Sequence, residues 1–296
     1  MTVTDHGREV LNFYAGPTAL PWTVRAQISR DIVDFHGSGM GVMEISHRYV
    51  PPAAAVRPRP GARYLHLVTN NTVEGTQFRA LPRVGVPLVA DMSSDLMTDG
   101  FDAAGCDLAY AHAQKNIGIA GVTIVLIRKS MLGKIVARPG ELPAILDYRT
   151  HVSHRSNYHT PPTFAIYVTW LMLGWIEEEM GGLAALGRVN RRKAATLYDL
   201  LDASPFYRGL AERDSRSVTN VTFALPTARL HEQFLEEAGK AGFVGLAGHR
   251  SAGGCRASLF NGVTQDMADR LTGFMAAFEQ RNQTREHRDQ EGSSDE

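Results

Sequence analysis

An aspartate and a lysine are the two residues of this sequence whose types and spacing first suggest chemistry. Asp91 closes the apolar run "VPLVAD", and Lys115 lies 24 residues later in the polar stretch "AHAQKNIGIAG". An interval of this length lets the chain leave one strand, make an excursion and return beside it. Both side chains would then lie at one edge of a sheet, where ligands of α/β proteins usually bind.

This pair fits the needs of one cofactor. A lysine amine attacks a carbonyl only when it is deprotonated or already bound as a Schiff base. Enzymes that use pyridoxal phosphate (PLP) have such a lysine, and an acid that keeps the pyridine nitrogen protonated, so that the ring accepts electrons when the α-proton leaves. A lysine at a sheet end is more often a solvated charge, and the spacing of Asp91 and Lys115 alone leaves that interpretation open.

The segments around the pair predict an α/β layer. Residues 64–128 alternate short β-rich runs with glycine-bearing loops; the runs are "RYLHLVT", "VPLVADM", "DLAYAHA" and "VTIVLIR". Near-continuous apolar strands of this kind are typical of a sheet that is covered on both faces. Before them, residues 22–35 have helical spacing, and the stretch "PPAAAVRPRPGAR" over 51–63 indicates a loop or an extended linker.

The rest of the chain predicts a second, smaller α/β unit. We expect helices over 164–179, 183–203 and 264–281. Between the last two, "SVTNVTFAL" and "CRASLFN" indicate strands and "LHEQFLEEAGKAG" a helix.

These elements give a domain organisation. We predict a large domain over 12–170, shortened around 49–64, and a small domain over 171–282. The last residues, 283–296, contain no apolar side chain, so we expect a disordered tail.

Composition excludes several classes of protein. Lys plus Arg and Asp plus Glu number 31 each, so no net field attracts nucleic acid or a membrane surface. Cys106 and Cys255 form no CxxC and have no histidine at ligand spacing, which argues against a disulfide framework or a zinc site. No apolar run reaches membrane-spanning length, and the first residues lack the apolar core of a signal peptide. We therefore expect a soluble cytoplasmic protein without a metal.

Six motifs resemble the phosphoserine aminotransferase family, which belongs to the class V, fold-type I PLP enzymes. In order they are "NFYAGPTALP", "HGSGMGVMEISHR", "VPLVADMSS", "AHAQKNIGIAG", "HTPPTFAIY" and "GHRSAGGCRAS", and the resemblance spans about 12–281. It implies a mainly parallel sheet flanked by helices, a smaller C-terminal α/β domain and a homodimer. It also implies amino transfer between glutamate/2-oxoglutarate and phosphoserine/3-phosphohydroxypyruvate, in serine (or pyridoxine) biosynthesis.

The resemblance implies roles for the residues that would hold PLP. Lys115 matches the lysine that binds the cofactor covalently and moves the α-proton, and Asp91 matches the partner of the pyridinium. Gln114 matches a ligand of the cofactor phosphate, and Thr72 a ligand of the ring hydroxyl.

Two further cofactor residues precede the long helix of residues 164–179. Thr160 matches a threonine that reaches the cofactor phosphate of the neighbouring subunit, and His159 replaces the family's asparagine just before it. From the residues alone, Thr160 also suits a plain helix cap before Pro161 and Pro162.

Cationic residues would bind the substrate, because the planar fork of arginine suits carboxylates and phosphates. Arg256 matches the arginine that takes the α-carboxylate. His249 and Arg250, with His47 and Arg48, match the groups at the distal phosphate or γ-carboxylate, the last two acting across the dimer interface. For each arginine, a solvated surface charge is the alternative.

The sequence also departs from the family. Only "YVPPAAAVRPRPGAR" stands where the family has a long block containing a glycine-rich phosphate-binding loop and an aromatic residue that stacks on the pyridine ring. This short segment is either a natural connection or the scar of a deletion or frameshift. Three hypotheses remain: an active transaminase, a PLP enzyme with altered chemistry, and a catalytically dead homologue that acts as an interaction protein.

Overall fold

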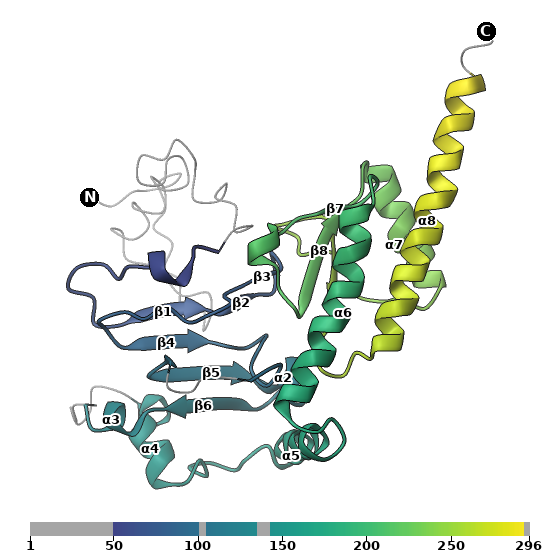
Figure 1. Ribbon diagram of the computed structural model, residues 1–296. Coiled ribbons are helices and arrows are strands. Elements are labelled where there is room, and N and C mark those ends of the chain that lie inside the picture. The colour runs from purple at the N-terminus through teal and green to yellow at the C-terminus, as the bar shows by residue number, and fades with distance from the viewer. Residues whose placement is uncertain (1–49, 101–104, 135–142, 293–296) are drawn as a thin grey trace, which may run out of the picture. The chain divides into compact units, whose positions relative to one another are not determined.

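A four-stranded sheet carries the first part of the chain that the structure describes. The computed structural model describes residues 50–100, 105–134 and 143–292, with side chains to 283. The strand order is β1–β4–β5–β6 (Figure 1), and the strands are β1 (Leu65–Val68), β4 (Leu88–Asp91), β5 (Leu108–His112) and β6 (Thr123–Ile127). β1 pairs with β4 and β4 with β5 in parallel, whereas β6 is antiparallel to β5. The predicted α/β fold is confirmed, with a mixed sheet in which two of the three pairings are parallel.

Small apolar side chains explain the close pairing in the middle of this sheet. Leu88 and Ala90 of β4 are buried, as are Leu108, Ala109 and Ala111 of β5. Their cross-strand register puts Val68, Asp91 and Tyr110 side by side at one level. Asp91 thus lies where β1 and β4 end, with β5 beside it.

Short elements connect the strands. They are η1 (Ala53–Ala55), β2 (Asn70–Asn71), β3 (Thr76–Gln77), α2 (Ala113–Asn116), α3 (Lys129–Leu132), η3 (Ala144–Leu146) and α4 (Tyr148–Ser153). The segment 51–63 has no regular structure besides η1, as predicted. The helix expected over 22–35 lies outside the described residues.

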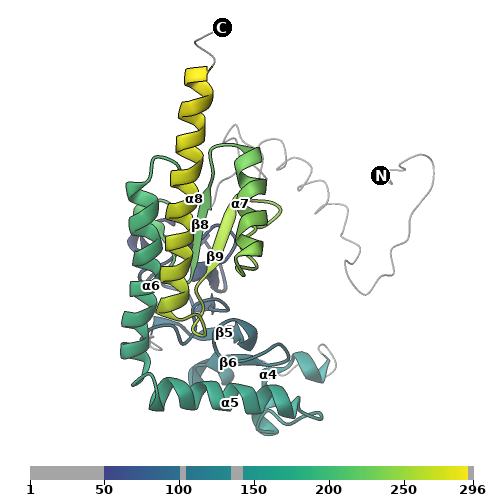
Figure 2. The ribbon, with the colours of Figure 1, turned by 90° about the vertical axis from the view of Figure 1, so that its right-hand side faces the viewer.

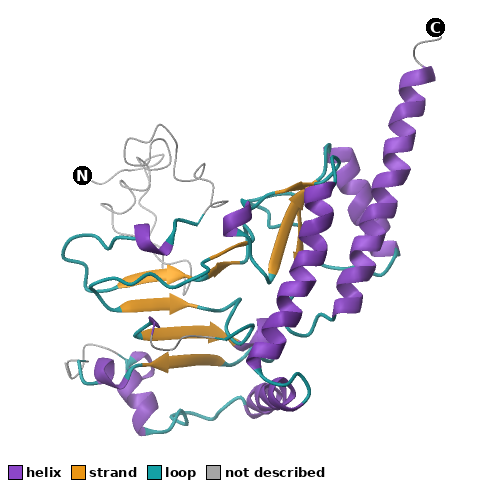
Figure 3. Cartoon of the chain, in the orientation of Figure 1, coloured by secondary structure: helices purple, strands orange, loops and turns teal. Residues whose placement is uncertain are grey.

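The second part of the chain combines long helices with a small antiparallel sheet. Its elements are α5 (Thr163–Glu178), α6 (Leu183–Ala203), β7 (Arg208–Gly209), η4 (Arg213–Ser215), β8 (Asn220–Ala224), α7 (Ala228–Lys240), β9 (Cys255–Ser258) and α8 (Gln265–Gly292). The strand order is β7–β8–β9, and both pairings are antiparallel. Helices α6 and α8 lie side by side against this sheet (Figures 2 and 3).

The long helices begin and end at recognisable signals. Gly181 and Gly182, both with positive φ, separate α5 from α6, and Thr227 caps α7 by accepting a hydrogen bond from the Leu230 N–H. Helix α8 continues through Gly292 into the segment for which we predicted disorder. Gln, Arg and Glu dominate that segment, and these residues favour helix even without apolar contacts. None of the helices in the described ranges is long and apolar enough to cross a membrane.

Each sheet has its own apolar core. Leu88, Ala90, Leu96 and Ile117 pack with Ile176 and Leu186 under the larger sheet. The second core gathers aromatic side chains from β8, α7, α8 and the loop before β7; they are Phe206, Tyr207, Phe223, Phe234 and Phe278. All these residues belong to one compact unit, Arg48–Glu296, so the predicted boundary near residue 170 remains a prediction.

Buried polar side chains join the small sheet to β2, which pairs with β3 in a separate two-stranded sheet, and to the loop after β4. Asn70 donates to Ser94 Oγ at 2.7 Å and to Asn220 Oδ1 of the small sheet at 2.8 Å. Ser217 donates back to Asn70 Oδ1. Because a buried polar group without a partner costs about 1–3 kcal/mol, this closed set of bonds fixes how the two sheets meet.

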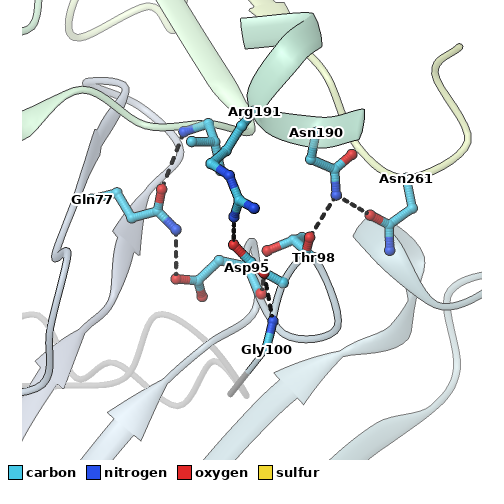
Figure 4. A network of polar contacts seen from close by, with 9 residues as sticks. Gln77, Asp95, Thr98, Gly100, Asn190, Arg191 and Asn261 are labelled. Carbon is cyan, nitrogen blue, oxygen red and sulfur yellow. Dashed lines mark hydrogen bonds and ion pairs between the residues drawn. The ribbon is translucent and has the colours of Figure 1, made fainter. Parts of the chain in front are cut away.

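A buried carboxyl group lies one turn after Asp91. Asp95 accepts a hydrogen bond from Thr69 Oγ1 at 2.5 Å. It accepts a second one from Gln77 Nε2 at 3.2 Å (Figure 4). Burial raises the pKa of Asp95 from 3.8 to about 6, although these two bonds oppose the shift and the charge of Asp91 adds to it. A raised pKa stabilises the fold below the ordinary pKa, and this stabilisation is lost as the pH rises through the folded value.

The free energy of unfolding should therefore fall by about 3 kcal/mol between about pH 4 and about pH 7 because of Asp95. We expect Asp95→Asn, which stays neutral, to lack this fall when urea unfolding is measured across that range. The exposed Asp214→Asn is the matched control. Parallel pH profiles for the unaltered chain and Asp95→Asn would contradict the prediction.

Candidate active site

A tight turn after β2 presents Thr72. Asn71 Oδ1 accepts hydrogen bonds from the N–H groups of Val73 at 3.0 Å and Glu74 at 3.3 Å, which holds the turn closed. Gly75 ends the turn with φ +71°, and a Cβ there would lie 2.6 Å from the carbonyl oxygen of Asn220. Only glycine fits this position, so the sequence fixes where the Thr72 hydroxyl lies.

Lys115 lies on the single turn of α2, directly after β5. The turn is anchored by its neighbours Ala113, Asn116 and Ile117, which are all buried, while Lys115 is half-buried. Its ammonium donates a hydrogen bond of 2.8 Å to Thr72 Oγ1. The turn after β2 and the turn after β5 therefore meet at the lysine.

Asp91 faces the same place from the end of β4. Its Oδ1 accepts a hydrogen bond of 2.9 Å from the N–H of Ser93, which orients the carboxylate. Its charge acts on the Lys115 ammonium. The structure thus places Lys115 against Thr72 and within the influence of the Asp91 charge, at one end of the parallel strands.

The pKa of Lys115 is lowered, and burial is the main cause. The carboxylates of Asp91 and Asp95 oppose this shift, whereas the positive charge of Arg256 adds to it. A lowered pKa increases the fraction of neutral amine, which is the nucleophilic form.

Arg256 reaches the site from the small sheet. It lies on β9, and its Nη1 donates to the carbonyl oxygen of Thr72 at 3.5 Å. Its Nε is buried and has no hydrogen-bond partner within the described chain. A buried guanidinium nitrogen without a partner suits a ligand carboxylate, which can accept two bonds from the planar fork.

The other predicted site residues lie apart from this cluster. Gln114 precedes Lys115 but is exposed, as are His159 and Thr160. Nδ1 of the His159 ring contacts the Thr160 carbonyl oxygen at 2.9 Å. Helix α5 begins at Thr163 with Pro162 at its N-cap and without a side-chain cap bond, so the interpretation of Thr160 as a helix cap is wrong. Its contact with a neighbouring subunit's cofactor remains a prediction.

The predicted distal substrate groups are only partly described. His249 and Arg250 are exposed in the loop before β9, where His249 Nδ1 contacts Ser251 Oγ at 2.7 Å. His47 and Arg48 lie outside the described residues, so their predicted role across the dimer interface remains a prediction.

Three residues at the site were not predicted. Tyr110 lies beside Asp91 on β5, and burial together with the Asp91 charge raises its pKa. Asp95 is a second carboxyl group whose charge acts on Lys115, and Asn261 contacts the residue that follows Lys115. The sequence offered one signal, an acidic residue one turn after Asp91 in "DMSSD".

The residues present fit PLP. An amine with a lowered pKa suits the aldehyde, a carboxylate at the strand end suits the pyridine nitrogen, and a hydroxyl beside the lysine suits the ring oxygen. The unpartnered guanidinium nitrogen adds a site for a carboxylate. What the cluster lacks, among the described residues, is a set of N–H donors at a long helix that would hold a phosphate.

Known proteins with similar sequences are aminotransferases. The aminotransferase class V family matches residues 46–271. The phosphoserine aminotransferase of Syntrophobacter fumaroxidans is 37% identical over 363 residues, which span 93% of this chain and 99% of that protein. That alignment is longer than the 296 residues of this chain, so the relative has residues that this chain lacks.

Solved structures agree. The phosphoserine aminotransferase from Bacillus circulans subsp. alkalophilus has a TM-score of 0.75 and 33% identity, covering 93% of this chain and 99% of its own. The PLP-bound phosphoserine aminotransferase from Trichomonas vaginalis has a TM-score of 0.68 and 26% identity, covering 90% of this chain and all of its own. Since the family match covers most of the sequence and the relatives are aligned along nearly their whole length, this chain belongs to the phosphoserine aminotransferase family of class V aminotransferases.

Proposed function

We propose that this chain is a PLP-dependent phosphoserine transaminase. It moves an amino group between phosphoserine/3-phosphohydroxypyruvate and glutamate/2-oxoglutarate, as a step of serine biosynthesis. The observation that carries the proposal is the Lys115 amine, held by Thr72 in reach of the charges of Asp91 and Arg256. The chain has two cysteines and no CxxC motif, which suits a reducing compartment, so we place the reaction in the cytoplasm.

Each side chain of the cluster then has a task. PLP, when bound, supplies an electron sink for the carbanion left at the substrate α-carbon. Lys115 binds the cofactor and carries the α-proton, for which its lowered pKa is suitable. Asp91 keeps the pyridine nitrogen protonated, and Thr72 orients the ring oxygen. Arg256 holds the substrate α-carboxylate with the nitrogen that has no partner in the described chain.

Removal of Lys115 tests this proposal. Addition of PLP to the purified chain should produce the absorbance band of lysine-bound cofactor, and Lys115→Ala should abolish it. The exposed Lys129→Ala should keep it, because its amine lies away from the site. An unaltered chain without a band would favour the alternative of a catalytically dead homologue.

Anchoring of the cofactor phosphate is the weak part of the proposed site. Within residues 50–71 no glycine-rich loop precedes a helix; η1, of three residues, is the one helical element there. Gln114 of the same subunit, with Thr160 and His159 of a second one, would have to bind the dianion. Each missing charge-assisted hydrogen bond costs about 1.5–3 kcal/mol.

We therefore expect pyridoxamine phosphate to bind at least about a hundredfold more weakly than to the Bacillus circulans relative. This molecule cannot bond to a lysine, so its affinity reports the non-covalent contacts alone. Calorimetric titration of both proteins measures the difference, and transaminase activity should require added PLP. Equal affinities would show that other residues have rebuilt the phosphate site.

An exposed apolar stripe on α5 supports a homodimer. Phe164 is 71% exposed, Trp170 65% and Tyr167 51%, and Leu171 extends the same face of the helix. These four side chains form the α5 stripe, which begins just after His159 and Thr160. We propose that a second copy covers it, because the same contact would carry Thr160 and His159 to the partner's cofactor.

Trp170→Glu should convert a dimer into a monomer by placing a charge in the α5 stripe. Sedimentation velocity measures the change, and PLP binding should weaken with it because Thr160 and His159 would no longer reach a partner. Glu178→Gln, exposed at the end of the same helix, is the control. A monomeric unaltered chain that binds PLP would exclude this division of labour.

A further inference from the structure

We propose that Asn261 is a positioning residue that sets the spacing between Lys115 and the segment following Asp91. Asn261 lies three residues after β9 and is only 4% exposed. Its Nδ2 donates to the carbonyl oxygens of Asn116, at 3.1 Å, and Met97, at 2.8 Å. One amide therefore bridges the two loops that carry the proposed catalytic groups.

The contact with Asn116 holds a turn that has little stability of its own. Helix α2 has four residues, so its last carbonyls have no intrahelical partner, and a helix this short gains nothing from cooperativity. Asn261 supplies the missing donor to Asn116, and its own N–H donates to Asn116 Oδ1 at 3.4 Å. Lys115, one residue earlier, depends on this support.

The contact with Met97 holds a strained backbone. Met97 has φ +58°, a conformation that costs a side-chain-bearing residue about 1–3 kcal/mol. The loop around it includes Asp95 and follows directly from Asp91. The hydrogen bond from Asn261 keeps this carbonyl turned toward the lysine turn.

Asn261 is itself fixed by helix α6. Asn190 Nδ2 donates to Asn261 Oδ1 at 2.9 Å and to the Thr98 carbonyl at 2.7 Å (Figure 4). One turn later, the fully buried Lys193 donates from Nζ to the carbonyls of Leu259, Phe260 and Val263, at 3.1, 3.2 and 2.8 Å. The main chain on both sides of Asn261 is thereby held, so that its amide has a single position.

This inference rests on the proposed function, because it concerns how the cofactor lysine is held. Two ligands separate positioning from general stability. PLP bonds to Lys115, whereas pyridoxamine phosphate does not, so misplacement of the lysine weakens only the first. We expect Asn261→Ala and the volume-preserving Asn261→Leu to lower the affinity for PLP, relative to that for pyridoxamine phosphate, by about tenfold.

Asn282→Ala is the matched control. Asn282 is equally buried and also donates to a backbone carbonyl, that of Phe278 at 2.8 Å, but it lies on α8 away from the lysine. It should lose stability as Asn261→Ala does and keep the affinity ratio of the unaltered chain. An unchanged ratio in both Asn261 variants would overturn the inference.

A second measurement needs no cofactor. In the apo protein, acetylation of Lys115 is followed by mass spectrometry across pH. The limiting rate at high pH, where the amine is fully deprotonated, should be several-fold higher in Asn261→Ala than in Asn282→Ala, because the released turn exposes the amine. The apparent pKa of Lys115 should also move up toward its ordinary value. If the unaltered chain fails to bind PLP, the proposed function is wrong, and this labelling still decides for or against Asn261.

Discussion

The parallel pairing of β4 with β5 is the constraint on which the site depends. The carboxyl ends of two neighbouring parallel strands lie at the same edge of the sheet. Asp91 at the end of β4 and Lys115 just after β5 therefore lie close together. The buried alanines of both strands are small, so neighbouring elements can pack closely against these strands. Thr72 joins from the turn after β1 and β2, and its hydroxyl receives the lysine.

The strands and long helices could be predicted because their signals are local. The apolar runs around Leu88 and Leu108 predicted β4 and β5. The glycines at 181 and 182 predicted where α6 begins, and its observed range, Leu183–Ala203, is the predicted one. Asp91 and Lys115 were found through their types and interval. Asn261 could not be found in this way, because its role comes from contacts with residues more than a hundred positions away. Asp95 gave a signal of type and spacing, but its raised pKa is a consequence of burial, which the sequence does not display.

Electrostatic effects at the lysine oppose one another, and this balance matters for the chemistry. Burial and Arg256 favour the neutral amine, whereas Asp91 and Asp95 favour the ammonium. The pKa of Asp95 is raised to about 6, so its carboxyl group is largely ionised at neutral pH and its charge then acts on Lys115. In the proposed function Arg256 has a double effect, since it would bind the substrate carboxylate and its charge lowers the pKa of the Lys115 amine. Replacement of Arg256 or of one of the two aspartates would therefore change the pKa of Lys115 as well as remove a contact.

The described residues separate two tasks that a PLP enzyme normally combines. Lys115, Asp91 and Arg256 lie on segments that are joined by buried hydrogen bonds, from Asn70 to Asn220 and from Asn261 to Asn116. Each of these bonds satisfies a buried polar group. The bonds depend on the pairing of β1, β4 and β5, so they persist in a shortened large domain in which these strands still pair. Anchoring of a phosphate depends instead on donors at the rim of the sheet, where Gln114 and Thr160 are exposed. A chain can therefore lose the second task while keeping the first, because the groups that position the lysine belong to the core and those that would hold the phosphate do not.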